Sequence, residues 1–202
     1  FTLDLNFSSQ TSKTLRISSP PRPMFSTGFY AAPGELIKIV VPKGINGLTV
    51  QIGGHTDNLT GKDPLKRDPV IINRKNLSSG TNYVRNLYGG TIYIWSSISF
   101  AEPVTFGISN AVVSPDFVLG EISNEEWIKK VKRSRVPWLE MRSKRVIFLV
   151  PRDKVVKKID GLLPNKSGAI GDNLTNPTAL MQEWNKRFER DYNAWMGLSD
   201  DA

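Results

Sequence analysis

From the N-terminus to about Gly120, apolar side chains occur in short runs that turn residues interrupt. The run LIKIVVP (residues 36–42) ends at a proline, which cannot donate to a β-ladder, and TIYIWSS (residues 91–97) follows two glycines. Such runs are typical of strands, and their spacing is typical of a β-sandwich. We predict strands at residues 2–7, 14–17, 35–41, 48–52, 70–73, 83–87, 91–96 and 104–109.

The pattern changes past Gly120. Ser123 and Glu126 have the spacing of a capping box, which predicts a helix that continues to about Arg133. A strand at residues 145–151 and a short helix directly after it are predicted next. The predicted fold class is α+β, with an antiparallel β-sandwich over residues 1–120 and a mixed α/β segment over residues 121–202 that ends in a long amphipathic helix.

That last helix is predicted to begin at Asn176 and Pro177 and to end near Met196. Apolar side chains recur along it every three or four residues, at Leu180, Met181, Trp184, Phe188, Tyr192 and Trp195. This strongly aromatic face either packs against the preceding elements or belongs to a larger domain that continues past Ala202.

The charge balance favours acidic partners. The chain has 27 Lys and Arg against 19 Asp and Glu, a formal net charge of +8. A solvated basic face is one interpretation and a nucleic-acid surface between Lys129 and Lys158 is another. The aromatic residues of that segment, Trp138 and Phe148, are explained by core positions, so we do not expect nucleic acid as a partner. We expect no membrane span either, because no apolar run approaches the roughly 20 residues that a spanning helix needs.

Catalytic residue types are scarce. The chain has no Cys and a single histidine, His55, which lies in VQIGGHTDNLTG beside Asp57. Zinc hydrolysis needs about three protein ligands, and a serine triad needs a nucleophile elbow that is absent from the sequence. Neither a catalytic nor a metal-ligating set is therefore predicted within this chain. We interpret His55 as a turn residue, with Gly53 and Gly54 permitting the turn and Asp57 or Asn58 capping it.

Five segments together resemble the enhancin-like zinc metallopeptidases, a gluzincin family that includes viral enhancins, bacterial mucin-degrading proteases and animal channel-associated relatives. They are STGFYAAPGELIKIVVP, VQIGGHTDNL, NLYGGTIYI, SPDFVLG and VPWLEMRSKRVIFLVP, in the family's order. The resemblance implies a sandwich, then a long helix leading to a catalytic core in which H-E-x-x-H and a distal Glu bind zinc. None of those zinc residues occurs here, so the chain resembles the N-terminal portion of the peptidase domain.

By this resemblance, the parent protein is a secreted or cell-surface zinc metallopeptidase that cleaves mucin-like or other glycoproteins. Its partners are the glycoprotein substrate and the remainder of the peptidase domain, and the chain by itself is non-catalytic. The alternative is a self-sufficient module of the same family that binds glycans or proteins without catalysis.

Six residues are candidates for the substrate cleft or the signature turn: His55, Asp57, Asn58, Tyr88, Tyr93 and Trp95. Exposure of Tyr93 or Trp95 on a concave sheet face would favour a glycan-binding module, because aromatic rings stack on sugars. Burial of these rings would count against it.

Zinc addition tests the expectation that this chain holds no metal site. We expect zinc to leave the thermal unfolding midpoint unchanged and to produce no cleavage of mucin. A stoichiometric, zinc-dependent rise in the midpoint would show that the chain itself binds the metal, since a ligand that prefers the native state stabilises it.

Overall fold

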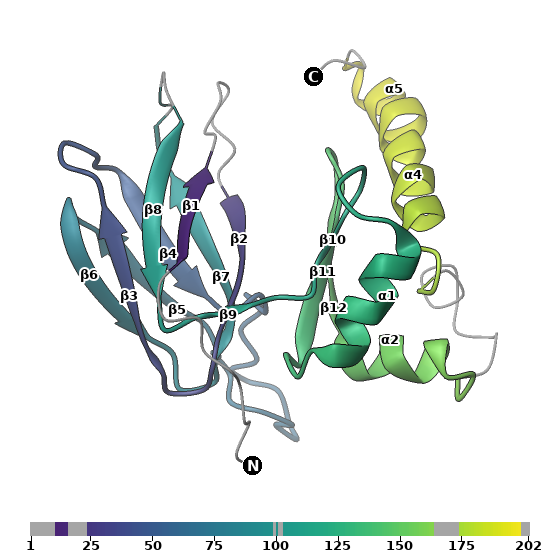
Figure 1. Cartoon of the computed structure of the whole chain (residues 1–202), viewed down its shortest axis with the longest axis horizontal. Helices are drawn as coiled ribbons and strands as arrows, with labels where there is room; N and C mark the ends of the chain where they lie inside the picture. Colours follow the sequence, from purple (N-terminus) through teal and green to yellow (C-terminus); the bar gives the residue numbers. More distant parts are fainter. Residues whose placement is uncertain (1–10, 16–23, 99, 101–102, 164–173, 199–202) are drawn as a thin grey trace. The chain divides into compact units, whose positions relative to one another are not determined.

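The computed structural model describes residues 11–15, 24–98, 100, 103–163 and 174–198 (Figure 1). The chain forms two compact units that divide between Val113 and Ser114. Antiparallel sheets followed by helices, the last of them C-terminal, confirm the predicted α+β class. The strand predicted at residues 2–7 lies outside the described residues.

The first unit is a sandwich of two antiparallel sheets. The five-stranded sheet has the order β5 (Asn73–Leu77), β4 (Leu48–Ile52), β7 (Gly90–Ser96), β2 (Met24–Ala31) and β9 (Val112–Val113). The four-stranded sheet has the order β1 (Thr11–Leu15), β8 (Val104–Ser109), β3 (Leu36–Val41) and β6 (Gly80–Arg85).

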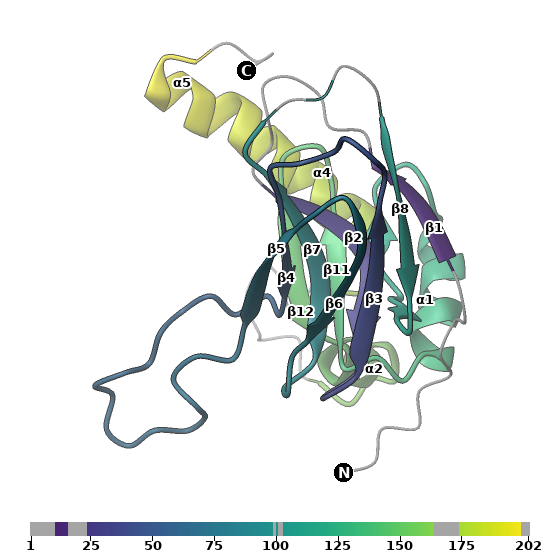
Figure 2. The same ribbon diagram turned by 90° about the vertical axis from the view of Figure 1, so that its left-hand side faces the viewer.

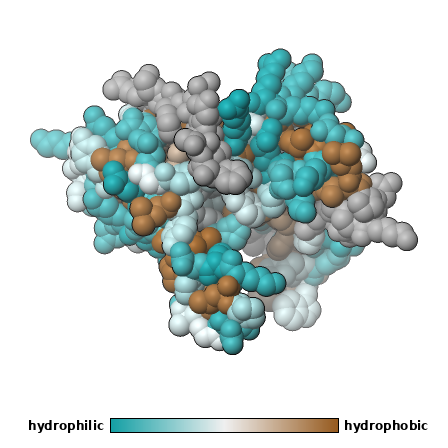
Figure 3. Space-filling model, turned by 90° about the horizontal axis from the view of Figure 1, so that it is seen from below, coloured by the Kyte–Doolittle hydropathy of each residue, from teal (hydrophilic) through white to brown (hydrophobic). Residues whose placement is uncertain are grey.

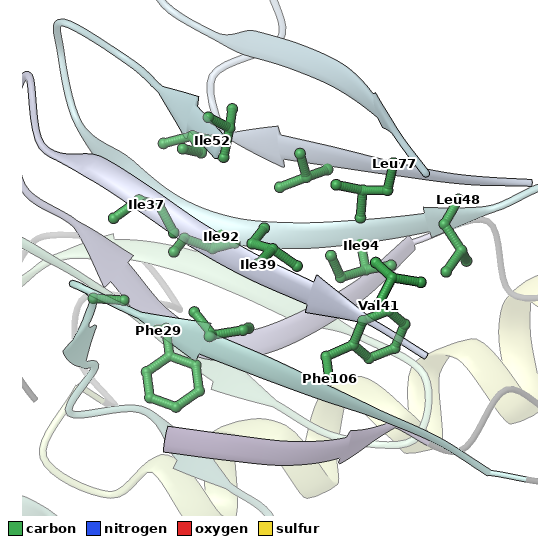
Figure 4. Close-up of a cluster of buried hydrophobic side chains, with 14 of the residues drawn as sticks. Phe29, Ile37, Ile39, Val41, Leu48, Ile52, Leu77, Ile92, Ile94 and Phe106 are labelled. Atoms are coloured by element: carbon green, nitrogen blue, oxygen red, sulfur yellow. The ribbon is translucent and has the colours of Figure 1, made fainter. Parts of the chain in front are cut away.

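A core of aliphatic side chains fills the space between these sheets (Figure 4). Ile37 and Ile39 of β3 face Ile92 and Ile94 of β7, and all four are fully buried. Strands β3, β4, β7 and β8 contribute alternate residues to this core, which is the period-two pattern of a sheet with one buried face. Burial of apolar area between the sheets is therefore what holds the first unit together.

Two strand predictions need correction. The strand expected at residues 70–73 is wrong, because β5 begins at Asn73 and its sequence, NRKNL, is exposed at every residue but Leu77. An edge strand needs few apolar residues, so the apolar run before it was misleading. The predicted set also omitted β2, in which a bulge between Ser26 and Tyr30 breaks the alternation.

The second unit contains a three-stranded sheet and the helices. Strand β10 (Phe117–Val118) runs parallel to β11 (Trp138–Arg142), a strand that was not predicted, and β11 pairs antiparallel with β12 (Ile147–Pro151). The helical segments are α1 (Asn124–Arg133), α2 (Arg152–Ile159), α4 (Pro177–Arg187), a π-helical turn (Phe188–Tyr192) and α5 (Asn193–Met196).

Both predicted helix starts are confirmed. At α1 the backbone N–H of Glu126 donates to the Ser123 hydroxyl over 3.2 Å, and the Glu126 carboxylate reaches back to the Ser123 N–H. At α4 the Asn176 side chain accepts from the N–H of Ala179. These bonds satisfy N–H groups that have no partner within the helix.

Charged side chains cluster where the segment before β10 meets β11; Asp116 and Glu140 are buried and Arg142 is half-buried. The Asp116 carboxylate accepts from the Ser114 hydroxyl at 2.5 Å and from the Glu140 backbone N–H at 2.8 Å. The Arg142 guanidinium lies 3.5 Å from carboxylate oxygens of both Asp116 and Glu140. A buried carboxylate is tolerated only with such partners, so this cluster fixes the segment that carries β10 against β11.

Seen from below, hydrophobic side chains form several separate groups among hydrophilic ones (Figure 3). Among the described residues, the most exposed large apolar side chains are Trp195, Leu87 and Leu162, at 80%, 74% and 72% of full exposure. Among the helices that the structure describes, none combines the length and apolar character needed to cross a bilayer.

Adjacent residues of β3 test which face of that strand is buried. Ile39 is 0% exposed and Val40 is 39% exposed. We expect Ile39→Ala to lower the free energy of unfolding by about 2–5 kcal/mol, since it leaves a cavity. Val40→Ala should cost about 0.5 kcal/mol. Denaturant unfolding of both variants checks this, and equal losses would contradict the assigned faces.

Candidate functional site

Residues 53–72, which we call the signature loop, connect β4 to β5 and project from one end of the sandwich (Figure 2). Arg67 braces the loop, because its Nη2 lies 2.6 Å from the Asp57 carboxylate and its Nη1 donates to the Asp68 carbonyl at 2.8 Å. The Asn58 side chain accepts from the N–H of Thr60 at 2.8 Å. These contacts close turns within the loop, as Asp and Asn commonly do.

Two side chains of the β6–β7 turn, Asn86 and Tyr88, form hydrogen bonds to the signature loop. The Tyr88 hydroxyl donates to the Asp68 carboxylate, and this hydrogen bond raises the pKa of Tyr88 above its ordinary value. The buried Asn86 amide nitrogen lies 2.9–3.0 Å from the carbonyl oxygens of Ile52, Ile71 and Gly89. One side chain thereby joins the end of β4, the end of the loop and the turn before β7.

Glycines allow the backbones to meet at this point. A Cβ on Gly90 would lie 2.6 Å from the Gly53 Cα, and both residues have positive φ angles, +135° and +107°. Side chains rarely adopt such angles, and no side chain fits in that space. The GGH and YGG motifs are therefore the two sides of one backbone contact.

The six predicted residues do not form one site. Asp57, Asn58 and Tyr88 belong to or contact the signature loop, and His55 is half-buried within it. Tyr93 and Trp95 lie on β7 instead. In the described part of the chain, no group of three His, Asp or Glu side chains is placed to hold a metal ion.

The outer face of the five-stranded sheet, the side turned away from the core, carries a second group of residues. Strand register places Asn76, Thr49 and Trp95 in one row across β5, β4 and β7. The next row contains Arg74, Gln51 and Tyr93. Side chains in these rows share a face, since alternate residues of a strand point to the same side.

Gln51 links these rows. Its Oε1 accepts from Arg74 Nε at 2.6 Å and from the Trp95 indole N–H at 3.1 Å, and its Nε2 donates to the Gly53 carbonyl at 2.7 Å. The Arg74 guanidinium carbon lies 4.9 Å from the centre of the Trp95 ring, within the range of a cation–π interaction. The outer face is thus connected to the start of the signature loop.

A hollow of about 430 Å³ opens beside Trp95 on this face. Its walls are Gly47, Leu48, Thr49, Asn76, Leu77, Trp95, Ser96 and Ser97. The volume falls within the range of small-ligand sites. Tyr93 is only 3% exposed, which counts against a sugar stacked on that ring, whereas the half-buried Trp95 contributes to the wall.

Sequence reasoning missed Arg74, Asn76, Gln51 and Thr49. The polar alternation of NRKNL marked an exposed edge strand, but only the register with β4 brings Arg74 and Asn76 beside Trp95. In the sequence, residues 73–77 are only a polar segment beside a turn, and this pattern does not show which strand they pair with.

These observations define a class: an α+β protein whose first unit is a β-sandwich with a polar, hollowed outer face. Residues 7–109 match the N-terminal domain of M60-like peptidases, and residues 110–194 match peptidase M60, enhancin and enhancin-like. The chain therefore belongs to the M60 family of enhancin-like peptidases. This confirms the resemblance drawn from the sequence.

Two solved structures illustrate the shared fold. The M60 catalytic domain of Clostridium perfringens ZmpC, in complex with the sialyl T antigen, is 15% identical with a TM-score of 0.68, covering 92% of this chain and 40% of that one. IMPa from Pseudomonas aeruginosa, in complex with an O-glycopeptide, is 21% identical with a TM-score of 0.62, covering 78% of this chain and 19% of that one.

Curated relatives correct one expectation. TRPM8 channel-associated factor 1 of Bos taurus is 37% identical over 131 residues, which are 62% of this chain and 14% of that protein. Matches in Danio rerio, Homo sapiens and Mus musculus are also TRPM8 channel-associated factors or a homolog. The expected secreted or cell-surface location is therefore wrong as an inference from the family, because these relatives are named for association with a channel.

The glycine contact in the signature motifs can be tested with two alanine variants. Gly90→Ala should lower the free energy of unfolding by about 3 kcal/mol or more, since it adds a backbone clash to positive-φ strain. Gly44→Ala has the strain alone, because a Cβ there meets nothing within 4 Å, and should cost about 1–2 kcal/mol. Equal losses in chemical denaturation would show that Gly90 and Gly53 are not in contact.

Proposed function

We propose that this chain is the N-terminal part of a zinc metallopeptidase that cleaves mucin-like or other glycoproteins. In this proposal the chain supplies the sandwich and the first elements of the peptidase domain. It contributes neither catalytic nor metal-binding residues.

The observation that carries the proposal is the succession of two family matches, residues 7–109 and then residues 110–194. The division between them lies close to the division between the compact units at Val113. Two structures of similar fold support glycoproteins as the substrate class, because one is a complex with an O-glycopeptide and the other a complex with the sialyl T antigen.

Zinc does not fit the residues of this chain. A catalytic zinc site needs about three protein ligands, usually including histidines, and the chain has one histidine. Zinc and the residue that activates its water would therefore come from the remainder of the peptidase domain.

An aromatic row that begins at Phe148 on β12 and continues along the last helical segment supports a contact with that remainder. Ring centres are separated by 5.2 Å between Phe148 and Trp184, 5.6 Å between Phe188 and Tyr192, and 6.4 Å between Tyr192 and Trp195. Exposure rises along the row, to 46% at Tyr192 and 80% at Trp195. Apolar surface of this kind is typical of an interface, so we propose that the rest of the peptidase domain covers it.

A second candidate function is a module of the same family that binds protein or glycan without catalysis. The names of the curated relatives favour it, since they describe association with a channel protein. This chain spans only 14–16% of the length of those relatives.

The coding sequence past Ala202 and the native product test the peptidase proposal. We expect an H-E-x-x-H segment downstream and zinc-dependent cleavage of an O-glycosylated mucin by the whole protein. Removal of zinc by a chelator should abolish cleavage, added zinc should restore it, and Glu→Gln within the H-E-x-x-H should abolish it permanently.

Two results would contradict the proposal. One is a reading frame that lacks H-E-x-x-H. The other is a folded, zinc-loaded whole protein that leaves O-glycosylated and unglycosylated substrates intact. Either result would favour the binding module.

A further inference from the structure

We propose that the outer face of the sandwich binds an acidic sugar, with Arg74 contacting the sugar carboxylate and the hollow beside Trp95 holding the ring. This site goes beyond the peptidase function. It is formed entirely by β4, β5, β7 and the turns that flank them.

Arg74 is already held in a binding geometry. Its Nε donates to Gln51 at 2.6 Å, and its guanidinium lies over the Trp95 ring at 4.9 Å. Within the described residues, nothing accepts a hydrogen bond from its two terminal nitrogens, and the side chain is exposed. Because the hydrogen bond at Nε and the contact of the guanidinium plane with the ring already hold the group in place, its two terminal nitrogens can bind a carboxylate at little further cost in conformational entropy.

The hollow supplies hydrogen-bonding groups that suit sugar hydroxyls. Thr49 Oγ1 donates to Asn76 Oδ1 at 2.9 Å, which leaves the Asn76 amide N–H₂ as a donor toward a ligand. Ser97 Oγ donates to the Gly47 carbonyl at 3.0 Å and keeps its lone pairs as acceptors. Trp95 adds part of an aromatic surface to the same wall.

The arrangement of these groups selects the ligand class. Arg74 and Asn76 alternate along β5, so a cationic group and a neutral polar hollow stand side by side on one face. A sugar that carries a carboxylate satisfies both at once, whereas a neutral sugar leaves Arg74 unused and an acidic peptide leaves the hydroxyl-rich hollow unmatched. The net charge of +8 also favours an anionic ligand.

Titration of the 202-residue chain with 3′-sialyllactose, lactose and N-acetylglutamate tests the site. The readout is the NMR signal of the Trp95 indole N–H, with the Trp195 indole on the last helix as an internal reference. We expect 3′-sialyllactose to shift the Trp95 signal saturably, lactose and N-acetylglutamate to shift it far less, and the Trp195 signal to stay in place.

Two substitutions and a matched control assign the carboxylate contact. Arg74→Lys keeps the charge but removes the planar fork, so the affinity for 3′-sialyllactose should fall about tenfold. Asn76→Asp places a negative charge in the hollow and should weaken binding at least as much. Arg85→Lys makes the same change at an exposed residue of β6, in the other sheet, and should leave affinity unchanged.

Several results would overturn the site. Equal responses to lactose and 3′-sialyllactose would show that the carboxylate is not recognised, and an equal response to N-acetylglutamate would point to acidic peptides instead. An unchanged affinity in a folded Arg74→Lys variant, or no shift of the Trp95 signal with any ligand, would also refute it. Each of these results would leave the peptidase function intact, because cleavage needs no ligand on the sandwich.

Discussion

The pairing of β4 with both of its neighbours is the constraint on which the first unit depends. On β4, Val50 and Ile52 point into the core, so Thr49 and Gln51 must point outward. On β7, Ile94 points into the core, so its neighbours Tyr93 and Trp95 also point outward. A slip of one residue would exchange the two sets and bury polar side chains. The register that buries the hydrophobic core therefore also determines which polar residues lie beside one another on the outer face.

A second constraint acts at the signature motif, where three backbone segments meet. The Asn86 amide joins three backbone segments, and Gly53 and Gly90 approach too closely for any side chain. A buried amide with all of its partners in place is costly to alter, because any replacement leaves carbonyl groups unsatisfied. Such a motif can be specific to a family because it determines backbone geometry, whether or not it contacts substrate.

The two units differ in how far they bury their apolar side chains. The sandwich encloses its apolar side chains between two sheets, whereas the aromatic row of the second unit becomes steadily more exposed toward Trp195. The family matches place that second unit in the peptidase M60 region. This chain spans 14–16% of the length of the curated relatives that it matches.

The sequence by itself determined the fold class, the helix starts at Ser123 and Asn176, most core strands and the family, because these depend on local periodicity, capping and motif order. It could not locate β2, where a bulge at Ser26 breaks the alternation, or β5, whose edge position needs few apolar residues. The candidate site was decided only by tertiary structure. Arg74 is 21 residues from Trp95, and strand register alone brings them together.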